Sequence, residues 1–374
     1  MPEPGDYKRT FVGDRPVVLA RNGEGELRCY VNRCAHRGVQ FCMRDSGRAT
    51  EWVCPYHQWV YDLDGRLVAV PFRRGVKGNG GMPAGFDTAE HGLVPLAVTE
   101  RHGVVFASFA EPSKPSEPSE PSGHGQLPPL EGYLGPTMLA YFDRVFDGRP
   151  LTLLGYQRQR VPGNWKLMFE NIKDPYHASL LHVFLVTFGL FRADQPSSVR
   201  MDETGRHAVL CSQRGEQHAG EATADMRSFH EDLRLADARL LDPVREFSGA
   251  ETVVMQTLWP NLIVQQQSNT LATRQLVTRG PGAFDLHWTF FGYATDDEPM
   301  RLRRLRQANL MGPSGFVSID DGEVMELSHE GISPWPDASG VLEMGGYDGA
   351  DTDHMVTEAA IRAFYGYYRR VMDL

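Results

Sequence analysis

The sequence lacks any apolar run long enough to cross a membrane, because no uninterrupted stretch approaches the roughly 18 residues that a membrane helix requires. Its start also lacks the apolar core of a signal peptide. Positive charge is scarce, since 38 Lys and Arg residues oppose 48 Asp and Glu residues and give a net charge of −10. This balance argues against nucleic acid or an anionic membrane as a partner. We therefore expect a cytoplasmic protein.

Cysteine is scarce too, with five residues in a chain of 374: Cys29, Cys34, Cys42, Cys54 and Cys211. An odd number of cysteines in a reducing compartment does not suggest a disulfide framework, so metal ligation is their better use. The chain is long enough for two or three domains and a large core.

The first 110 residues predict an all-β unit. Short segments rich in Val, Phe, Tyr and Trp read as strands, at residues 15–20, 27–31, 51–53, 59–61 and 103–109. Asn22-Gly23 and Asp64-Gly65 are typical hairpin turns between such strands.

Two loops of this unit carry metal-ligand residues. Cys34 and His36 form a Cys-x-His pair, and after 17 intervening residues Cys54 and His57 form a Cys-x2-His pair. Zinc is one alternative, but structural zinc sites usually pair like ligands at short spacing. One Cys and one His in each loop suit a cluster with two different irons, one held by thiolates and the other by imidazoles.

A Pro-, Ser- and Glu-rich repeat at residues 111–126 predicts an extended linker without a core. It separates the unit at 1–110 from a second predicted domain at 127–374. Within the first unit, the Gly-rich run at residues 73–81 lacks the frame of a phosphate-binding loop, and we expect a flexible basic loop.

The stretch from Asn164 to His182 places Glu170, Asp174, His177 and His182 in an otherwise mostly apolar helix. Such groups are costly to bury unless they are paired or bind a metal. His177 and His182 are five residues apart, about 140° around an ideal helix, so both reach one ion only if the helix starts, ends or bulges there. Pro175 gives a reason for a new helix start. The alternative is a core helix with two satisfied histidines.

Two imidazoles need a carboxylate to form the open two-His-one-carboxylate site of non-haem Fe(II). Gly312-Pro313-Ser314-Gly315 reads as a turn that opens a helix, and Asp320 and Asp321 fall in its early turns. An acidic helix start that favours the helix dipole explains the same pair without a metal.

On these motifs the chain resembles the α subunits of Rieske-type non-haem iron ring-hydroxylating oxygenases. The resemblance implies an α+β protein: an all-β Rieske [2Fe–2S] domain followed by a helix-grip (START-like) catalytic domain with an antiparallel sheet. It also implies that Cys34, His36, Cys54 and His57 hold the [2Fe–2S] cluster.

The same resemblance implies a mononuclear non-haem Fe(II) held by His177, His182 and Asp321, with Asp320 the weaker choice. Asp174 is then the catalytic acidic residue that bridges toward a Rieske histidine of a neighbouring subunit. Implied partners are ferredoxin and an NAD(P)H-dependent ferredoxin reductase. The implied assembly is either α3β3, with a small β subunit, or a homotrimer.

Downstream segments at 252–277 and 284–293 predict further strands, and 357–372 predicts an amphipathic helix. Residues 301–309 predict a basic surface helix with its arginines toward solvent.

Arg274 stands alone among apolar strand residues, where a guanidinium in a cavity would fit an aromatic carboxylate. Edge-strand exposure to water is the alternative. Gln267 and Ser318 are further candidates for substrate binding. The resemblance extends to members that act on benzoates, which implies oxidation of salicylate to gentisate with O2. Dihydroxylation of anthranilate or terephthalate is the alternative.

Two hypotheses of another class stay open at this point. A Rieske electron carrier that never turns over substrate would have no use for His177, His182 and Asp321, and would hold two irons per chain rather than three. A zinc-stabilised scaffold would be colourless.

Overall fold

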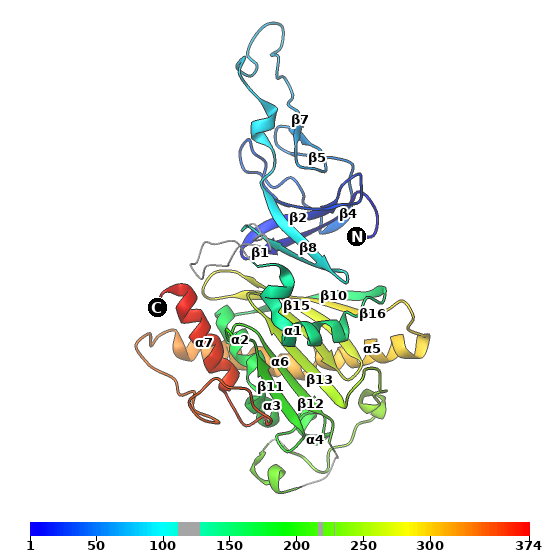
Figure 1. Ribbon diagram of the computed structural model, residues 1–374, viewed down its shortest axis with the longest axis vertical. Helices are drawn as coiled ribbons and strands as arrows, with labels where there is room; N and C mark the ends of the chain where they lie inside the picture. Colours follow the sequence, from blue (N-terminus) through cyan, green and yellow to red (C-terminus); the bar gives the residue numbers. More distant parts are fainter. Residues whose placement is uncertain (111–127, 216–219, 228) are drawn as a thin grey trace. The chain divides into compact units, whose positions relative to one another are not determined.

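The computed structural model describes residues 1–110, 128–215, 220–227 and 229–374, and the chain divides into two compact units (Figure 1). Unit 1 is Met1–Leu130 and unit 2 is Glu131–Leu374. The predicted linker at 111–126 lies outside the described residues, so the predicted domain limits stay a prediction.

Unit 1 is built from two antiparallel sheets, as the strand-rich sequence predicts. The larger sheet has the order β4-β1-β2-β3-β8-β9, and its strands are β1 (Asp6–Val12), β2 (Arg15–Arg21), β3 (Leu27–Val31), β4 (Ser46–Arg48), β8 (Pro95–Arg101) and β9 (Val104–Ser108). The smaller sheet consists of β5 (Trp52–Val53), β6 (Val60–Tyr61) and β7 (Leu67–Ala69), followed by the short helix η1 (Thr88–His91).

The predicted hairpin turn at Asn22 is confirmed. The Oδ1 atom of Asn22 accepts hydrogen bonds from the backbone N–H groups of Glu24 and Glu26, which closes the turn between β2 and β3. Strand β4 could not be predicted from an apolar pattern, because all three of its residues are exposed. This strand is defined by its pairing with β1 and not by an apolar pattern.

Unit 2 contains a seven-stranded antiparallel sheet in the order β10-β16-β15-β14-β13-β12-β11. Its strands are β10 (Leu151–Val161), β11 (Ser197–Met201), β12 (Ala208–Gln213), β13 (Glu251–Leu258), β14 (Leu262–Gln267), β15 (Thr270–Thr278) and β16 (Phe284–Tyr293). Its helices are α1 (Leu130–Val145), α2 (Trp165–Lys173), α3 (Pro175–Leu181), α4 (Val183–Thr187), α5 (Glu298–Met311), α6 (Phe316–Ile332) and α7 (Ala359–Met372), with the short turns η2 (Glu221–Asp225) and η3 (Ala238–Leu241). The predicted strands at 252–277 and 284–293 and the helix at 357–372 are confirmed.

Helices cover both faces of this sheet (Figure 1). On β13, Gln256 donates to the carbonyl of Met138 in α1, whereas the hydroxyl of Thr257 accepts from Lys173 in α2. Because successive strand residues point to opposite faces, α1 and α2 lie on opposite sides of the sheet. Helix α2 also contacts α6 and α7. No helix within the described residues is long and apolar enough to span a bilayer.

The predicted basic surface helix is only partly correct. Helix α5 forms over the predicted residues, but the Arg304 side chain is buried. Its guanidinium lies 2.7 Å from the Asp296 carboxylate, pairs with Glu246, and donates to the backbone carbonyl of Asn269 at 2.7 Å. Burial of this arginine is possible because two carboxylates compensate its charge.

Lys173, the last residue of α2, is fully buried and is paired much less completely. Its Nζ donates to the Oγ1 of Thr257 at 2.9 Å, and the rings of Phe169 and Phe364 lie nearby. Burial lowers the pKa of Lys173 from 10.5 to about 7, and the more distant charge of Asp202 opposes this shift. The protonated form is therefore disfavoured in the folded protein.

This burial predicts a pH-dependent stability difference between the wild type and Lys173→Met. Between about pH 7 and 10 the unfolded chain binds a proton at Lys173 that the folded chain does not, so this residue makes the wild type more stable as pH rises. The free energy of unfolding of the variant relative to wild type should therefore fall by ~2 kcal/mol from pH 7 to pH 9, measured by urea unfolding. Lys77→Met, at an exposed lysine, is the control and should show no such trend. A pH-independent difference for Lys173→Met would refute the assigned burial of the charge.

Candidate metal centres and substrate site

The break between α2 and α3 is set by Asp174 and Pro175. Asp174 ends α2, and its Oδ1 accepts hydrogen bonds from the backbone N–H groups of Tyr176 (2.9 Å) and His177 (3.2 Å). Pro175 occupies the first position of α3, where its missing N–H has no cost. His182 follows the last residue of α3 with non-helical dihedrals (φ −87°, ψ 86°). The predicted helix start is confirmed, and it frees both imidazoles from ideal helical spacing.

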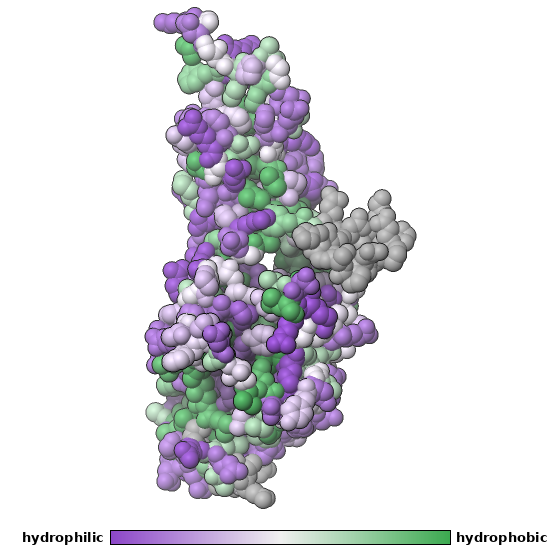
Figure 2. Space-filling model, turned by 90° about the vertical axis from the view of Figure 1, so that its left-hand side faces the viewer, coloured by the Kyte–Doolittle hydropathy of each residue, from purple (hydrophilic) through white to green (hydrophobic). Residues whose placement is uncertain are grey.

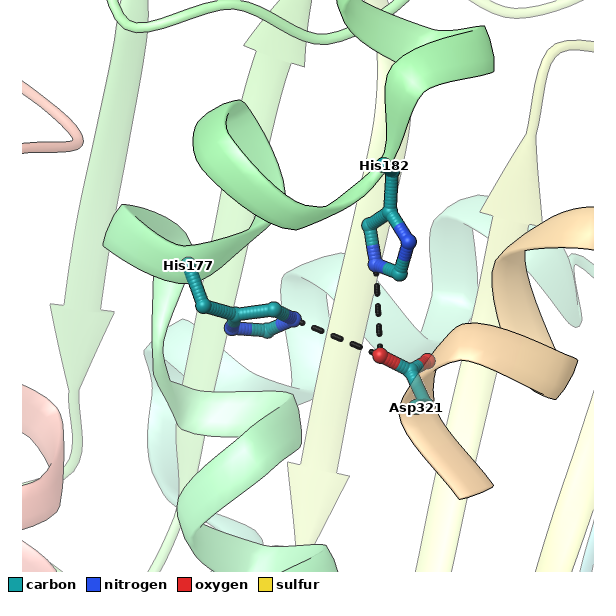
Figure 3. A group of neighbouring side chains, drawn as sticks. All are labelled: His177, His182 and Asp321. Atoms are coloured by element: carbon teal, nitrogen blue, oxygen red, sulfur yellow. Dashed lines mark ion pairs between the residues drawn. The ribbon is translucent and has the colours of Figure 1, made fainter. Parts of the chain in front are cut away.

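His177 and His182 converge with Asp321 on one point (Figure 3). The Oδ1 of Asp321, on α6, lies 3.4 Å from the Nε2 of His177 and 3.2 Å from the Nε2 of His182. One ligand atom from each residue lies within 4.8 Å of the others. A non-haem Fe(II) site with open positions uses this donor set, which consists of two imidazoles and one carboxylate. The residues present therefore fit the metal.

A second carboxylate lies beside the Nδ1 atom of each imidazole. The Oδ2 of Asp320 is hydrogen-bonded to the Nδ1 of His182 at 3.2 Å, which favours the tautomer that leaves the Nε2 of His182 free for a metal. The Oδ2 of Asp174 lies 3.3 Å from the Nδ1 of His177 without forming a hydrogen bond to it. Asp320 and Asp321 therefore have different positions, although the sequence presents them as one acidic pair.

The protonation of the three residues is tightly linked. Burial lowers the pKa of His177, but the Asp174 and Asp321 carboxylates, which favour the protonated imidazole, outweigh burial and raise the pKa to about 10. Burial raises the pKa of Asp321, and its two histidine partners more than offset this and hold it well below the ordinary value. The site thus favours a carboxylate anion beside positive charge, which a divalent cation would supply in place of protons.

Asn171 belongs to the site, although it was not among the predicted site residues. Its Nδ2 donates to the Oδ1 of Asp321 at 3.0 Å and lies 3.4 Å from the Nε2 of His177. The residue stands in the same stretch as the two histidines, and its position one helical turn before Asp174 was the available signal.

Arg274 lies in the interior of the sheet. Strand β15 is flanked by β14 and β16, so the edge-strand alternative is wrong, and Arg274 is only 3% exposed. Its Nε donates to the Oε1 of Gln265 at 2.9 Å, its Nη2 donates to the same atom, and the guanidinium stacks 4.3 Å from the centre of the Trp288 ring. Asp321 acts on its charge from a greater distance.

The other two substrate candidates are also buried. The Oε1 of Gln267 accepts from the Nε2 of Gln265 at 2.6 Å, and the hydroxyl of Ser318 donates to the carbonyl of Met311 at 3.1 Å. The direct partner of Arg274 is therefore Gln265, which the sequence did not single out from the Gln265-Gln266-Gln267 run. The substrate roles of Arg274, Gln267 and Ser318 stay predictions.

In unit 1, two similar loops present the predicted cluster ligands. The backbone of Cys34 bonds to Val39 and Gly38, and the backbone of Cys54 bonds in the same way to Trp59 and Gln58. Gly38 and Gln58 occupy the same place in the two loops, and both have positive φ (74° and 55°).

The side chains of these loops fit a cluster with two thiolate and two imidazole ligands. Both cysteines are buried, and the rings of His36 and His57 lie 4.6 Å apart. The Sγ of Cys34 lies 3.1 Å from the hydroxyl of Tyr61. The Nδ1 of His57 is buried and has no hydrogen-bond partner among the described residues, as expected for an atom reserved for a metal.

Residues 1–79 match the family model of the Rieske [2Fe–2S] domain, and residues 149–374 match that of the ring hydroxylating alpha subunit catalytic domain. The chain therefore belongs to the family of Rieske ring-hydroxylating oxygenase α subunits. Over its whole length it is 51% identical to the large oxygenase component of salicylate 5-hydroxylase from a Ralstonia species, of which it covers 86%. It is 42% identical to the anthranilate 1,2-dioxygenase large subunit of Burkholderia cepacia, again over its whole length and over 85% of that protein.

The fold is also that of solved proteins. The structure of naphthalene 1,2-dioxygenase from a Rhodococcus species bound to indole aligns with a TM-score of 0.76 at 22% sequence identity, covering 100% of this chain and 87% of that one. The predicted α+β fold is confirmed, as are the enzyme class, the Rieske [2Fe–2S] cluster and the mononuclear iron. The electron carrier without turnover and the zinc scaffold are set aside. The individual ligands stay predictions that the geometry supports.

The geometry predicts that Asp321→Ala lowers the iron content from three to two atoms per chain. Two imidazoles without the carboxylate leave the mononuclear site with too few ligands, whereas the ligands of the cluster lie in the other unit. Iron analysis together with the visible spectrum of the cluster measures both centres. Asp320→Asn is the matched control, because the amide can still contact the Nδ1 of His182, and it should retain the third iron. Retention of three irons by Asp321→Ala would show that this carboxylate is not a ligand.

Proposed function

We propose that the chain is the large, terminal oxygenase component of a multicomponent hydroxylase that converts salicylate to gentisate. The identity to the salicylate 5-hydroxylase component supports this substrate, and the buried cation at Arg274 supports the benzoate class. The second candidate is dihydroxylation of anthranilate or terephthalate, which the names of the relatives at 42% and 40% identity favour.

The observation that carries the substrate class is the neutral partner of Arg274. Burial lowers the pKa of Arg274 to about 10, so the guanidinium is still protonated at neutral pH. Its hydrogen bonds go to the amide oxygen of Gln265, which accepts them but, being neutral, does not cancel the charge. A buried cation without a directly paired carboxylate is costly, and a substrate carboxylate would reduce this cost on binding.

Gln267 and Ser318 would then form hydrogen bonds with the ring substituent next to the substrate carboxylate. The Oε1 of Gln267 is occupied by Gln265, so its amide N–H groups are the donors that it can offer. The hydroxyl proton of Ser318 is directed to Met311, so its oxygen can only accept. An acceptor and a donor together suit the ring hydroxyl of salicylate, which needs both.

When bound, the mononuclear iron activates O2 and the Rieske cluster supplies electrons one at a time. The protein positions the ring: Arg274 would fix the carboxylate so that the carbon to be oxidised faces His177, His182 and Asp321. The Oδ2 of Asp174 lies 3.3 Å from the Nδ1 of His177, and we propose that Asp174 bridges toward a Rieske histidine of a neighbouring subunit.

We further propose that electrons come from NAD(P)H through a reductase and a ferredoxin. We also propose that the protein is cytoplasmic. The proposed assembly is α3β3 with a small β subunit or a homotrimer of this chain.

Gln265→Glu should raise the KM for salicylate on the order of 100-fold, with a smaller change in kcat. The new carboxylate would neutralise Arg274 and compete with the substrate for it, and a charge-assisted pair contributes roughly 2–3 kcal/mol. Steady-state kinetics over a range of salicylate concentrations separates the two parameters.

Gln266→Glu is the matched control for this measurement. Gln266 is the next residue on β14, and its Oε1 accepts from Arg144 of α1 on the opposite face of the sheet. The same added charge there should leave KM unchanged. Equal KM values for Gln265→Glu and wild type would contradict recognition of the carboxylate by Arg274.

Product analysis tests the proposed reaction. The purified protein, supplied with a ferredoxin, its reductase and NADH, should convert salicylate to 2,5-dihydroxybenzoate, as identified by chromatography and mass spectrometry. Anthranilate and terephthalate, run in parallel, should give little product. Faster turnover of either one than of salicylate would favour the second candidate.

A further inference from the structure

Unit 1 carries a basic and apolar surface beside the Rieske loops, here called the 72–77 face. It consists of Phe72, Arg73, Arg74, Val76 and Lys77, all of them exposed. Phe72 and Val76 are 75% and 51% exposed, unusually high for side chains of this kind. The segment belongs to the long loop after β7, at the top of the view in Figure 1.

The charge of this face is not neutralised. Several other arginines of unit 1 pair with carboxylates, as in Arg9–Asp45 (2.8 Å) and Arg21–Glu100 (3.1 Å). Within the described residues, Arg73, Arg74 and Lys77 have no acidic partner, and Arg73 instead donates to the carbonyl of Phe86 at 2.8 Å.

The surrounding unit does not cancel this charge. Residues 1–110 contain 14 Lys and Arg against 12 Asp and Glu, whereas the whole chain has a net charge of −10. On the face of the protein shown in Figure 2, hydrophilic residues of the upper part, unit 1, are interspersed with hydrophobic ones. A positive patch on an otherwise acidic chain selects an acidic partner.

A row of aromatic contacts leads from this face to a predicted cluster ligand. The guanidinium of Arg73 lies 5.5 Å from the centre of the Phe86 ring, and Phe86 meets Trp59 edge-on at 5.9 Å. Trp59 in turn stacks on the imidazole of His36, with ring centres 4.8 Å apart and planes 4° from parallel. Three successive contacts therefore join the exposed basic loop to His36.

We propose that the 72–77 face is the docking site for the electron donor, an acidic [2Fe–2S] ferredoxin. Docking there brings the donor next to the aromatic row that ends at His36, and one electron then leaves the reduced ferredoxin for the Rieske cluster. Small interfaces with a few apolar contacts and a charged rim are typical of such transient partners. The inference rests on the proposed function, since only a terminal oxygenase needs such a donor.

The test is the rate at which the holoenzyme oxidises a reduced plant-type [2Fe–2S] ferredoxin, followed by stopped-flow absorbance. The variant Arg73→Glu/Arg74→Glu/Lys77→Glu should lower the second-order rate constant at least about 10-fold at low ionic strength, with a weaker dependence on salt than wild type. Arg15→Glu is the control: Arg15 is exposed and has no acidic partner among the described residues, but it lies at the start of β2. It should leave the rate constant near the wild-type value. Equal rate constants for the triple variant and Arg15→Glu would overturn the proposal.

Two further measurements separate other causes of a slow rate. Product formed in a single turnover after chemical reduction with dithionite bypasses the donor, and it should be the same in the triple variant and wild type. Loss of that product would overturn the proposal by showing that the substitutions damage the oxygenase itself, and absence of product in the wild type would instead contradict the proposed function. Sedimentation velocity should give the same assembly for both proteins. Dissociation of the triple variant would assign the face to contacts between copies of this chain and overturn its assignment to the donor.

Discussion

The catalytic unit depends on one local constraint, the capping of α3 by Asp174 directly before Pro175. The proline ends one helix and opens the next, and the Asp174 carboxylate satisfies two of the backbone N–H groups that the new helix exposes. The other oxygen of the same side chain lies 3.3 Å from the Nδ1 of His177. One residue therefore caps the new helix and places a negative charge beside the first histidine, and the turn lets both imidazoles reach Asp321 on α6.

Near that turn, carboxylates lie beside both nitrogens of each histidine ring. Asp321 stands between the two Nε2 atoms, while Asp174 and Asp320 stand behind the two rings. Elsewhere in the unit, Arg304 is compensated by two carboxylates, whereas Lys173 and Arg274 have neutral partners. Unit 2 thus contains one buried cation that is directly paired with carboxylates and two that are not.

Much of this could be predicted from the sequence, for identifiable reasons. The presence of one Cys and one His in each loop favoured an iron–sulfur cluster over zinc, and Pro175 predicted the helix break that lets His177 and His182 converge. The choice between Asp320 and Asp321 came from the family resemblance, and their different positions became visible only with the backbone of α6 in place. Periodicity could not predict the burial of Arg304, because its partner Glu246 lies far away in the sequence. Likewise the contact between Gln265 and Arg274 depends on the register of β14 against β15, which the run of three glutamines leaves open.

The alternation of Gln265 and Gln266 across β14 has a consequence for how this family can diverge. Two neighbouring residues have unrelated surroundings: Gln265 faces the buried guanidinium of Arg274, and Gln266 faces α1 on the other side of the sheet. Under the proposed role of Arg274, a change at the first position alters recognition while the contact with α1 stays intact. A ring without an anionic group would then leave a buried cation without its partner, so under the same proposal relatives that accept such rings should have lost the arginine itself.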